Sequence, residues 1–221
     1  PNVGVVKVPD DRLDQIVGFV KPQSIVPTVI EFVDIAGLVQ GASKGEGLGN
    51  QFLGNIRQTD AIIHVVRCFD DPDVIHVSGS VDPIRDIEVI NTELMLADLD
   101  SIDKRRQRIE KTAKSSKDPN MLVELDLVLK THAALSSGKP ARTIELDEKT
   151  EPIMKSLQLL TSKPTLYACN LNEADFTAGG NDWSNKVASY ASQEGNLAIN
   201  ICSAMEAEIA QLPIEERKDF L

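Results

Sequence analysis

An apolar, β-branched run that leads into a glycine-rich loop is the feature that most constrains the fold of this chain. The run covers residues 29–38 and predicts a buried strand. It contains the pattern Asp34-x-x-Gly37, and residues 41–50 form the loop. At the end of a parallel strand, where open α/β sheets bind ligands, an aspartate can hold Mg²⁺ and a glycine lets a backbone N–H approach a phosphate. The alternative is an ordinary turn between a strand and a loop.

The overall charge argues against one class of function and leaves a local basic patch possible. The chain has 221 residues, enough for one domain with an insertion or for two small domains. Its net charge of −11 argues against a protein that binds nucleic acid through its overall charge. We expect a cytoplasmic protein without a membrane partner, because no apolar run is long enough to span a bilayer. No signal peptide is visible, but the chain starts without Met, so a targeting segment ahead of residue 1 stays an open alternative.

The cysteines and histidines give no metal site. Cys68, Cys169 and Cys202 lie in or beside apolar runs. Their spacing fits neither a metal site nor a disulfide framework, so we expect buried free thiols in a reducing compartment. His64 lies inside an apolar run, and we expect it to be packed or at a sheet edge rather than catalytic.

The order of the predicted elements indicates an α/β protein with a mostly parallel sheet. Further strands are expected at residues 3–8, 61–69, 164–169 and 197–201, with a helix starting at 9–14 and another at 183–192. Because parallel strands end at one edge of a sheet, Asp34, Asn170 and Ser203 are expected to converge there.

Between these strands, the pattern changes to two long helices. Residues 83–115 and 121–135 carry apolar stripes joined by a short turn, which predicts an antiparallel helical hairpin. We therefore expect an inserted domain at 83–150 and a nucleotide-binding domain formed by 1–82 and 151–221. The tip of the hairpin is basic and is either a solvated face or a docking arm for an acidic or RNA-rich partner. Its cations are Lys104, Arg105, Arg106, Arg108, Lys111 and Lys114.

Strand–Asp-x-x-Gly, strand–Asn-x-x-acid and strand–Ser-Ala follow one another in the order found in guanine-nucleotide-type P-loop proteins. Several segments resemble more closely the YchF subfamily of Obg-like ATPases, and the resemblance covers nearly the whole chain. The segments are residues 34–39 (DIAGLV), 41–50 (GASKGEGLGN), 82–88 (DPIRDIE), 160–164 (LTSKP) and 170–173 (NLNE).

The resemblance implies a nucleotide site residue by residue. Asp34 and Gly37 correspond to the Mg²⁺ and γ-phosphate switch. Base recognition is implied for Asn170, Leu171 and Glu173, with Ser203 and Ala204 supporting the base. Ordinary GTPases carry Asn-Lys-x-Asp, so the leucine and the longer glutamate should abolish strict guanine selection. The resemblance therefore implies ATP as the preferred nucleotide, GTP as a weaker one, Mg²⁺ as cofactor and the ribosome as partner.

Two observations concern catalysis, one in comparison with ordinary GTPases and the other in comparison with the family. Leu38 stands where many GTPases have the glutamine that orients water, so no catalytic residue is assigned. The family's P-loop would lie upstream of residue 1, and its C-terminal TGS domain after Leu221. We therefore expect this chain to be a fragment that, alone, neither hydrolyses nucleotide nor folds well.

Two functions fit the sequence, and a third lacks the residues that it would need. The leading hypothesis is a nucleotide-switched ATPase. The alternative is a non-catalytic binding module that acts through the basic hairpin and binds its partner regardless of nucleotide. An unrelated doubly wound α/β enzyme would need a Rossmann glycine fingerprint or a nucleophile with its base, and neither is present. At single residues, Asn170 could serve only to stabilise a turn and Ser203 only to cap a helix.

Overall fold

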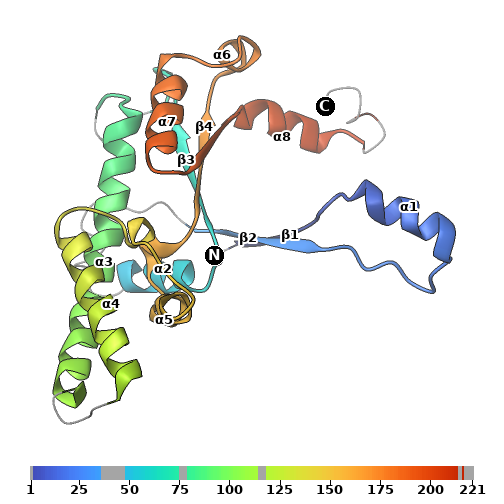
Figure 1. Ribbon diagram of the computed structural model, residues 1–221. Coiled ribbons are helices and arrows are strands. Elements are labelled where there is room, and N and C mark those ends of the chain that lie inside the picture. The colour runs from blue at the N-terminus through green and yellow to red at the C-terminus, as the bar shows by residue number, and fades with distance from the viewer. Residues whose placement is uncertain (1, 36–47, 75–78, 114–117, 214–215, 217–221) are drawn as a thin grey trace. The chain divides into compact units, whose positions relative to one another are not determined.

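The computed structural model describes residues 2–35, 48–74, 79–113, 118–213 and 216 (Figure 1). The chain divides into two compact units, Pro1–Leu38 and Val39–Leu221. In the described part of the chain, no helix combines the length and the apolarity needed to cross a membrane.

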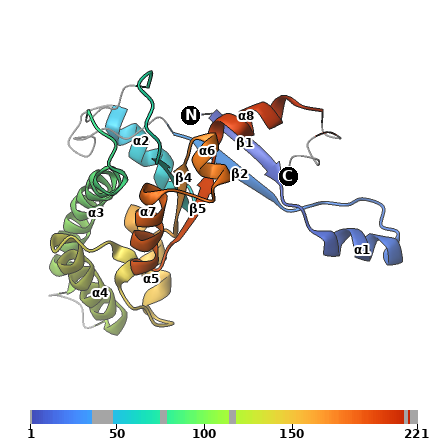
Figure 2. The same ribbon diagram turned by 90° about the horizontal axis from the view of Figure 1, so that it is seen from above.

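The first unit is a two-stranded antiparallel ribbon with one helix. β1 (Asn2–Lys7) pairs with β2 (Val29–Asp34), and Asn2 lies opposite Asp34. The connection holds α1 (Asp11–Val20), which begins where the side chain of Asp10 accepts a hydrogen bond of 3.0 Å from the N–H of Arg12. Figure 2 shows the ribbon and its helix in blue. The strand predicted at residues 3–8 and the helix start predicted at 9–14 are confirmed.

The prediction that residues 29–38 form a buried strand is wrong in its burial. All residues of β2 except Val33 are exposed, and Phe32 retains 44% exposure. An apolar run shows that a strand tolerates burial, but burial itself needs a layer on each face. A strand of a two-stranded ribbon has only one neighbour, and a ribbon provides no such layer. Residues 36–38 of the run lie outside the described residues.

The second unit is built on a parallel sheet with the strand order β3–β4–β5. Its strands are β3 (Ile62–Arg67), β4 (Thr165–Asn170) and β5 (Leu197–Ile201). One face packs against α3 (Pro83–Ala113) and α7 (Asp182–Gln193) through a core that includes Tyr167, Ile87 and Val187. The predicted α/β class with parallel strands is therefore confirmed.

The chain between β3 and β4 forms the predicted pair of long helices. α3 lies beside α4 (Pro119–Ser136), and Ile102 and Val128 are buried in the core they share (Figure 1). α4 begins sharply because Asp118 accepts a 2.9 Å hydrogen bond from the N–H of Asn120 and a proline occupies the first turn. The domain boundaries at residues 83 and 150 stay a prediction.

Shorter elements complete the second unit. They are α2 (Leu48–Arg57), η1 (Ala141–Thr143), α5 (Thr150–Leu157), η2 (Leu160–Ser162), α6 (Glu173–Thr177) and α8 (Ser203–Gln211). α5 contributes Met154 to the core of the hairpin. The start of residues 151–221, which were predicted to belong to the nucleotide-binding domain, therefore packs with the hairpin helices rather than with the sheet.

The root of the hairpin is joined to the sheet through a buried carboxylate. Asp98 of α3 is 0% exposed and accepts hydrogen bonds from the N–H groups of Leu160 (2.8 Å) and Thr161 (2.7 Å) and from the hydroxyl of Thr161 (2.7 Å). Burial raises the pKa of Asp98, and these hydrogen bonds oppose the rise. Asp98 thereby fixes the segment that leads directly into β4.

A second joint connects α2 to the hairpin. The guanidinium of Arg57, at the end of α2, donates to the hydroxyl of Ser101 in α3 (3.0 Å) and to the carbonyl of Gln158 (3.3 Å). The Nζ of Lys163 donates to the carbonyls of Arg57 and Thr59. The helix that follows the glycine-rich loop is thus held against α3 and the start of β4.

Candidate functional site

The ends of β4 and β5 bring two predicted site residues together. Asn170 is the last residue of β4, and its Oδ1 accepts a hydrogen bond of 3.0 Å from the N–H of Ser203 at the start of α8. Beside it, the N–H of Leu171 donates to the carbonyl of Ile201 (2.8 Å). The convergence of Asn170 and Ser203 expected from a parallel sheet is therefore observed.

The same geometry tests whether Ser203 serves only to cap a helix and whether Asn170 serves only to stabilise a turn. The N-cap of α8 is Cys202, so Ser203 is the first helical residue and does not act as the cap. Asn170 does stabilise the junction, but through only one end of its amide. Among the described residues, none accepts a hydrogen bond from its Nδ2. That group remains available as a donor to a ligand.

The three other predicted residues of this edge differ in accessibility. Glu173 is exposed in the first turn of α6, and within the described chain its carboxylate has no hydrogen-bond partner. Ala204 is exposed in the first turn of α8. Leu171 is only 2% exposed and belongs to the core between the sheet and α7, so only its backbone can face a ligand.

The residues predicted to bind phosphate and metal belong to the first unit. Asp34 is exposed at the end of β2, and Gly37 and Leu38 lie outside the described residues. The convergence of Asp34 with Asn170 and Ser203 stays a prediction, because β2 pairs with β1, whereas Asn170 ends β4 and Ser203 follows β5 in the second sheet. No group of three His, Cys, Asp or Glu side chains suited to a metal ion occurs in the described ranges.

Asn181, Asp175 and Asn172 form a hydrogen-bonded group next to these loops that the sequence did not predict. The Nδ2 of Asn181 donates both to the carbonyl of Cys68 (2.8 Å) and to Oδ2 of Asp175 (2.8 Å). Asp175 also accepts from Nδ2 of Asn172 (3.1 Å). An asparagine three residues before Ser184 is a capping signal that could have located the start of α7. Nothing in the sequence indicates the contact with Cys68, which is distant along the chain.

The predicted free thiols are confirmed. Cys68, Cys169 and Cys202 are free and buried near the C-terminal ends of the three parallel strands. The hydrogen bond with the thiol of Cys169, together with burial, raises the pKa of Cys68 far above its usual range. Because a thiolate is the reactive form, Cys68 is expected to be inert toward electrophiles.

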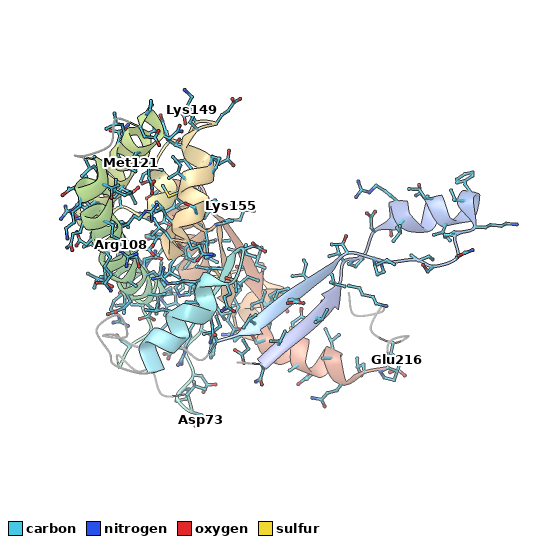
Figure 3. The ribbon with its side chains drawn as sticks, turned by 90° about the horizontal axis from the view of Figure 1, so that it is seen from below. Asp73, Arg108, Met121, Lys149, Lys155 and Glu216 are labelled. Carbon is cyan, nitrogen blue, oxygen red and sulfur yellow. The ribbon has the colours of Figure 1, made fainter. Side chains whose placement is uncertain are left out.

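Neighbouring carboxylates pair with three of the six cations predicted at the basic tip of the hairpin. Lys104 pairs with Asp100 at 2.6 Å, Arg105 of α3 pairs with Glu124 of α4, and Arg106 lies 3.2 Å from Asp103. Arg108 is exposed (Figure 3), and within the described chain it has no ion-pair partner. The solvated-face alternative therefore accounts for three of these four cations. Lys111 is also exposed, and Lys114 lies outside the described residues.

His64 packs in the covered face of the sheet, as expected for a structural histidine. Its ring lies 5.7 Å from that of Tyr167. Tyr167 in turn donates to Oε2 of Glu194 (2.9 Å), which also pairs with Arg142 (2.8 Å). Burial lowers the pKa of His64 from 6.5 to about 4, although Asp86 opposes this shift.

His64 is therefore expected to make stability depend on pH. Its folded pKa lies below its unfolded value, so the unfolded chain takes up the proton first, and stability is lost as pH falls from 6.5 to about 4. The full loss is about 3 kcal/mol. Urea unfolding at pH 7 and pH 4.5 should show a smaller decrease in the His64→Gln variant than in the unmodified protein. Equal decreases in both proteins would contradict this assignment.

Comparison with known proteins identifies this parallel sheet, with its loops at one edge, as part of a P-loop GTPase fold. The chain belongs to the 50S ribosome-binding GTPase family, whose sequence model matches residues 5–126. It is 50% identical over 222 residues to the ribosome-binding ATPase YchF of Bacillus subtilis, covering 100% of this chain and 60% of that protein. With Obg-like ATPase 1 of Caenorhabditis elegans it shares 39% identity over 223 residues, covering 100% of this chain and 56% of the relative.

A solved structure supports the same assignment. The Schizosaccharomyces pombe YchF GTPase matches 99% of this chain with a TM-score of 0.81 and 36% identity, and 60% of that protein is covered. The resemblance to the YchF subfamily is therefore confirmed. The chain spans about 60% of the length of the relatives just described.

Proposed function

We propose that a full-length protein carrying this chain binds and hydrolyses ATP and associates with the ribosome according to its nucleotide state. The observation that carries the proposal is the hydrogen bond between Oδ1 of Asn170 and the N–H of Ser203. It joins the two loops that would surround a base and leaves Nδ2 of Asn170 as a donor. The names of the relatives, ribosome-binding ATPase and Obg-like ATPase, support the activity and the partner. Ribosome association would place the protein in the cytoplasm.

The preference for ATP is argued from Leu171 and Glu173. A guanine-specific loop presents an aspartate that accepts two hydrogen bonds from the base. Glu173 is one methylene longer, so its carboxylate would reach past that position. Leu171 is buried in the core and provides no cationic side chain beside the base. Neither residue would therefore favour guanine over adenine.

Asp34 is the proposed Mg²⁺ ligand. A single exposed carboxylate fits the usual binding of Mg²⁺, which takes one or two carboxylates and completes its shell with water and nucleotide phosphates. The bound ion would neutralise charge on the phosphates during transfer to water. Gly37 is proposed to contact the γ-phosphate through its backbone. We assign no side chain of this chain to the activation of water.

Binding of RNA through Lys104, Arg105, Arg106 and Arg108 is not favoured. The first three cations are engaged with carboxylates of the hairpin itself, so binding to phosphates would first require these ion pairs to break. The alternative function, a binding module indifferent to nucleotide, rests on the same cations and is weakened by the same ion pairs.

Equilibrium titration of the full-length protein with ATP and GTP in the presence of Mg²⁺ tests the proposal. We expect saturable binding of ATP, weaker binding of GTP and slow release of phosphate from ATP. Ribosome sedimentation with a non-hydrolysable ATP analogue or ADP should give different bound fractions. The proposal is contradicted if ATP does not bind, and the ATP preference is contradicted if GTP binds at least as tightly.

Glu173→Asp is expected to raise GTP affinity relative to ATP by about tenfold, because the shorter carboxylate can reach the position at which guanine donates. The measurement is the ratio of the two dissociation constants. Glu206→Asp, an exposed substitution in the first turn of α8, is the matched control and should leave the ratio unchanged. An unchanged ratio in the Glu173 variant would remove that residue from base selection.

A further inference from the structure

Asn181 makes more contacts than its role at the start of α7 requires. Its Oδ1 accepts from the N–H of Ser184 (3.0 Å), and the hydroxyl of Ser184 accepts from the N–H of Asn181 (2.9 Å). This reciprocal pair is a capping box. The capping box uses only the oxygen of the Asn181 amide and would form equally well with Ser or Asp at this position.

The amino group of the same amide bonds to two segments outside α7. One hydrogen of Nδ2 goes to the carbonyl of Cys68, just after β3, and the other goes to Oδ2 of Asp175 in α6. Both distances are 2.8 Å. An amide has two N–H donors, so this donor capacity is fully used. Asn181 therefore joins the end of β3 to α6.

Asp175 is in turn hydrogen-bonded to the loop that follows Asn170. Its carboxylate accepts from Nδ2 of Asn172 (3.1 Å), and its N–H donates to Oδ1 of Asn172 (2.8 Å). Asn172 directly precedes Glu173 in the chain. The orientation of residues 172 and 173 thus depends on a carboxylate that Asn181 holds in place.

The turn before Asn181 is also fixed. Gly180 has φ +135, and a Cβ there would lie 2.8 Å from the hydroxyl of Ser184. The Nδ2 of Asn200, on β5, donates to the carbonyl of Gly179 (2.9 Å). These contacts hold Asn181 in place relative to both β5 and β3. Its hydrogen bond to Asp175 can therefore keep α6 in one orientation.

We propose that Asn181 is a positioning residue for base recognition: through Asp175 and Asn172 it fixes where Glu173 stands relative to Asn170. This inference rests on the proposed function, because it assigns a nucleobase as the ligand of these loops. A fixed carboxylate can discriminate between bases, whereas a mobile one accepts hydrogen bonds in many positions. Asn181 would act on selectivity without touching the nucleotide.

Two substitutions separate positioning from capping. Asn181→Ser and Asn181→Asp both keep an oxygen that caps α7, and both lose the two N–H donors. In the full-length protein with Mg²⁺, we expect ATP affinity to fall about tenfold and the ratio of ATP to GTP affinity to move toward one. Circular dichroism should show both variants folded at the titration temperature. Asn185→Ser, one turn further along α7, is the control and should retain both values.

The outcomes are distinct. Unchanged affinity and ratio in both variants would overturn the inference, and so would an equal loss of affinity for ATP and GTP, which would indicate a general structural effect. If the Asn181 and Asp175 contacts act together, Asn181→Ser combined with Asp175→Ala should lower ATP affinity no further than the stronger single substitution. Failure of the unmodified protein to bind any nucleotide would instead contradict the proposed function.

Discussion

Asp98→Ala is expected to lower the free energy of unfolding by about 3–5 kcal/mol. The substitution leaves the N–H groups of Leu160 and Thr161 and the hydroxyl of Thr161 without their acceptor in a site that water does not reach. Asp98→Asn should also destabilise strongly, because its amino group would face groups that are themselves donors. Urea unfolding measures both effects.

Asp100→Ala is the matched control on the same helix. Asp100 is exposed, and within the described part of the chain its single ion-pair partner is Lys104, so its loss should change stability by about 0.5 kcal/mol or less. If Asp98→Ala were as mild as this control, the buried carboxylate would not be the joint that holds the hairpin root to the sheet.

Asn170→Ala is expected to weaken ATP binding by about a hundredfold, the largest effect on ligand affinity. It removes the proposed donor to the base and also the acceptor of the Ser203 N–H, and each loss is worth about tenfold. The measurement is equilibrium titration of the full-length protein with ATP and Mg²⁺.

Asn170→Asp divides this effect into its two parts. The aspartate still accepts the hydrogen bond from Ser203 but has no N–H to donate, so its affinity should fall between those of the unmodified protein and the alanine variant. Asn185→Ala, on the exposed face of α7, should bind ATP normally. Normal ATP binding by Asn170→Ala would exclude this residue from the site.

The sequence was most informative where a residue is constrained by its immediate neighbours along the chain. The strands around Val66 and Ala168 could be predicted because continuous apolar runs favour strands. The run does not show how many faces are covered, since Ile63 and Val65 on the second face of β3 stay exposed. The adjacency of Asn170 and Ser203 followed from topology alone, since neighbouring parallel strands end at one edge. The ligand roles of these two residues came from the resemblance to a family.

What the sequence could not provide depends on partners distant along the chain. The burial of Phe32 was wrongly predicted because an apolar strand does not specify which layer covers it. The pairing of Arg105 with Glu124 requires the register between α3 and α4, which the individual helix patterns do not fix. The contact of Asn181 with Cys68 joins segments separated by the entire hairpin, and no local pattern encodes it.

The inserted hairpin has a consequence for the order of folding. β3 and β4 are neighbours in the sheet, yet the whole hairpin lies between them in the chain, and closing so long a flexible loop is entropically costly and slow. Helices form locally and fast, and in the folded chain Asp98 holds the entrance of β4 against α3, which follows β3. Once the hairpin has formed, the chain ends that lead to β3 and β4 are close together, so the two strands can pair quickly. Synthesis of the chain must therefore pass residue 170, the end of β4, before β3 and β4 can pair along their full length.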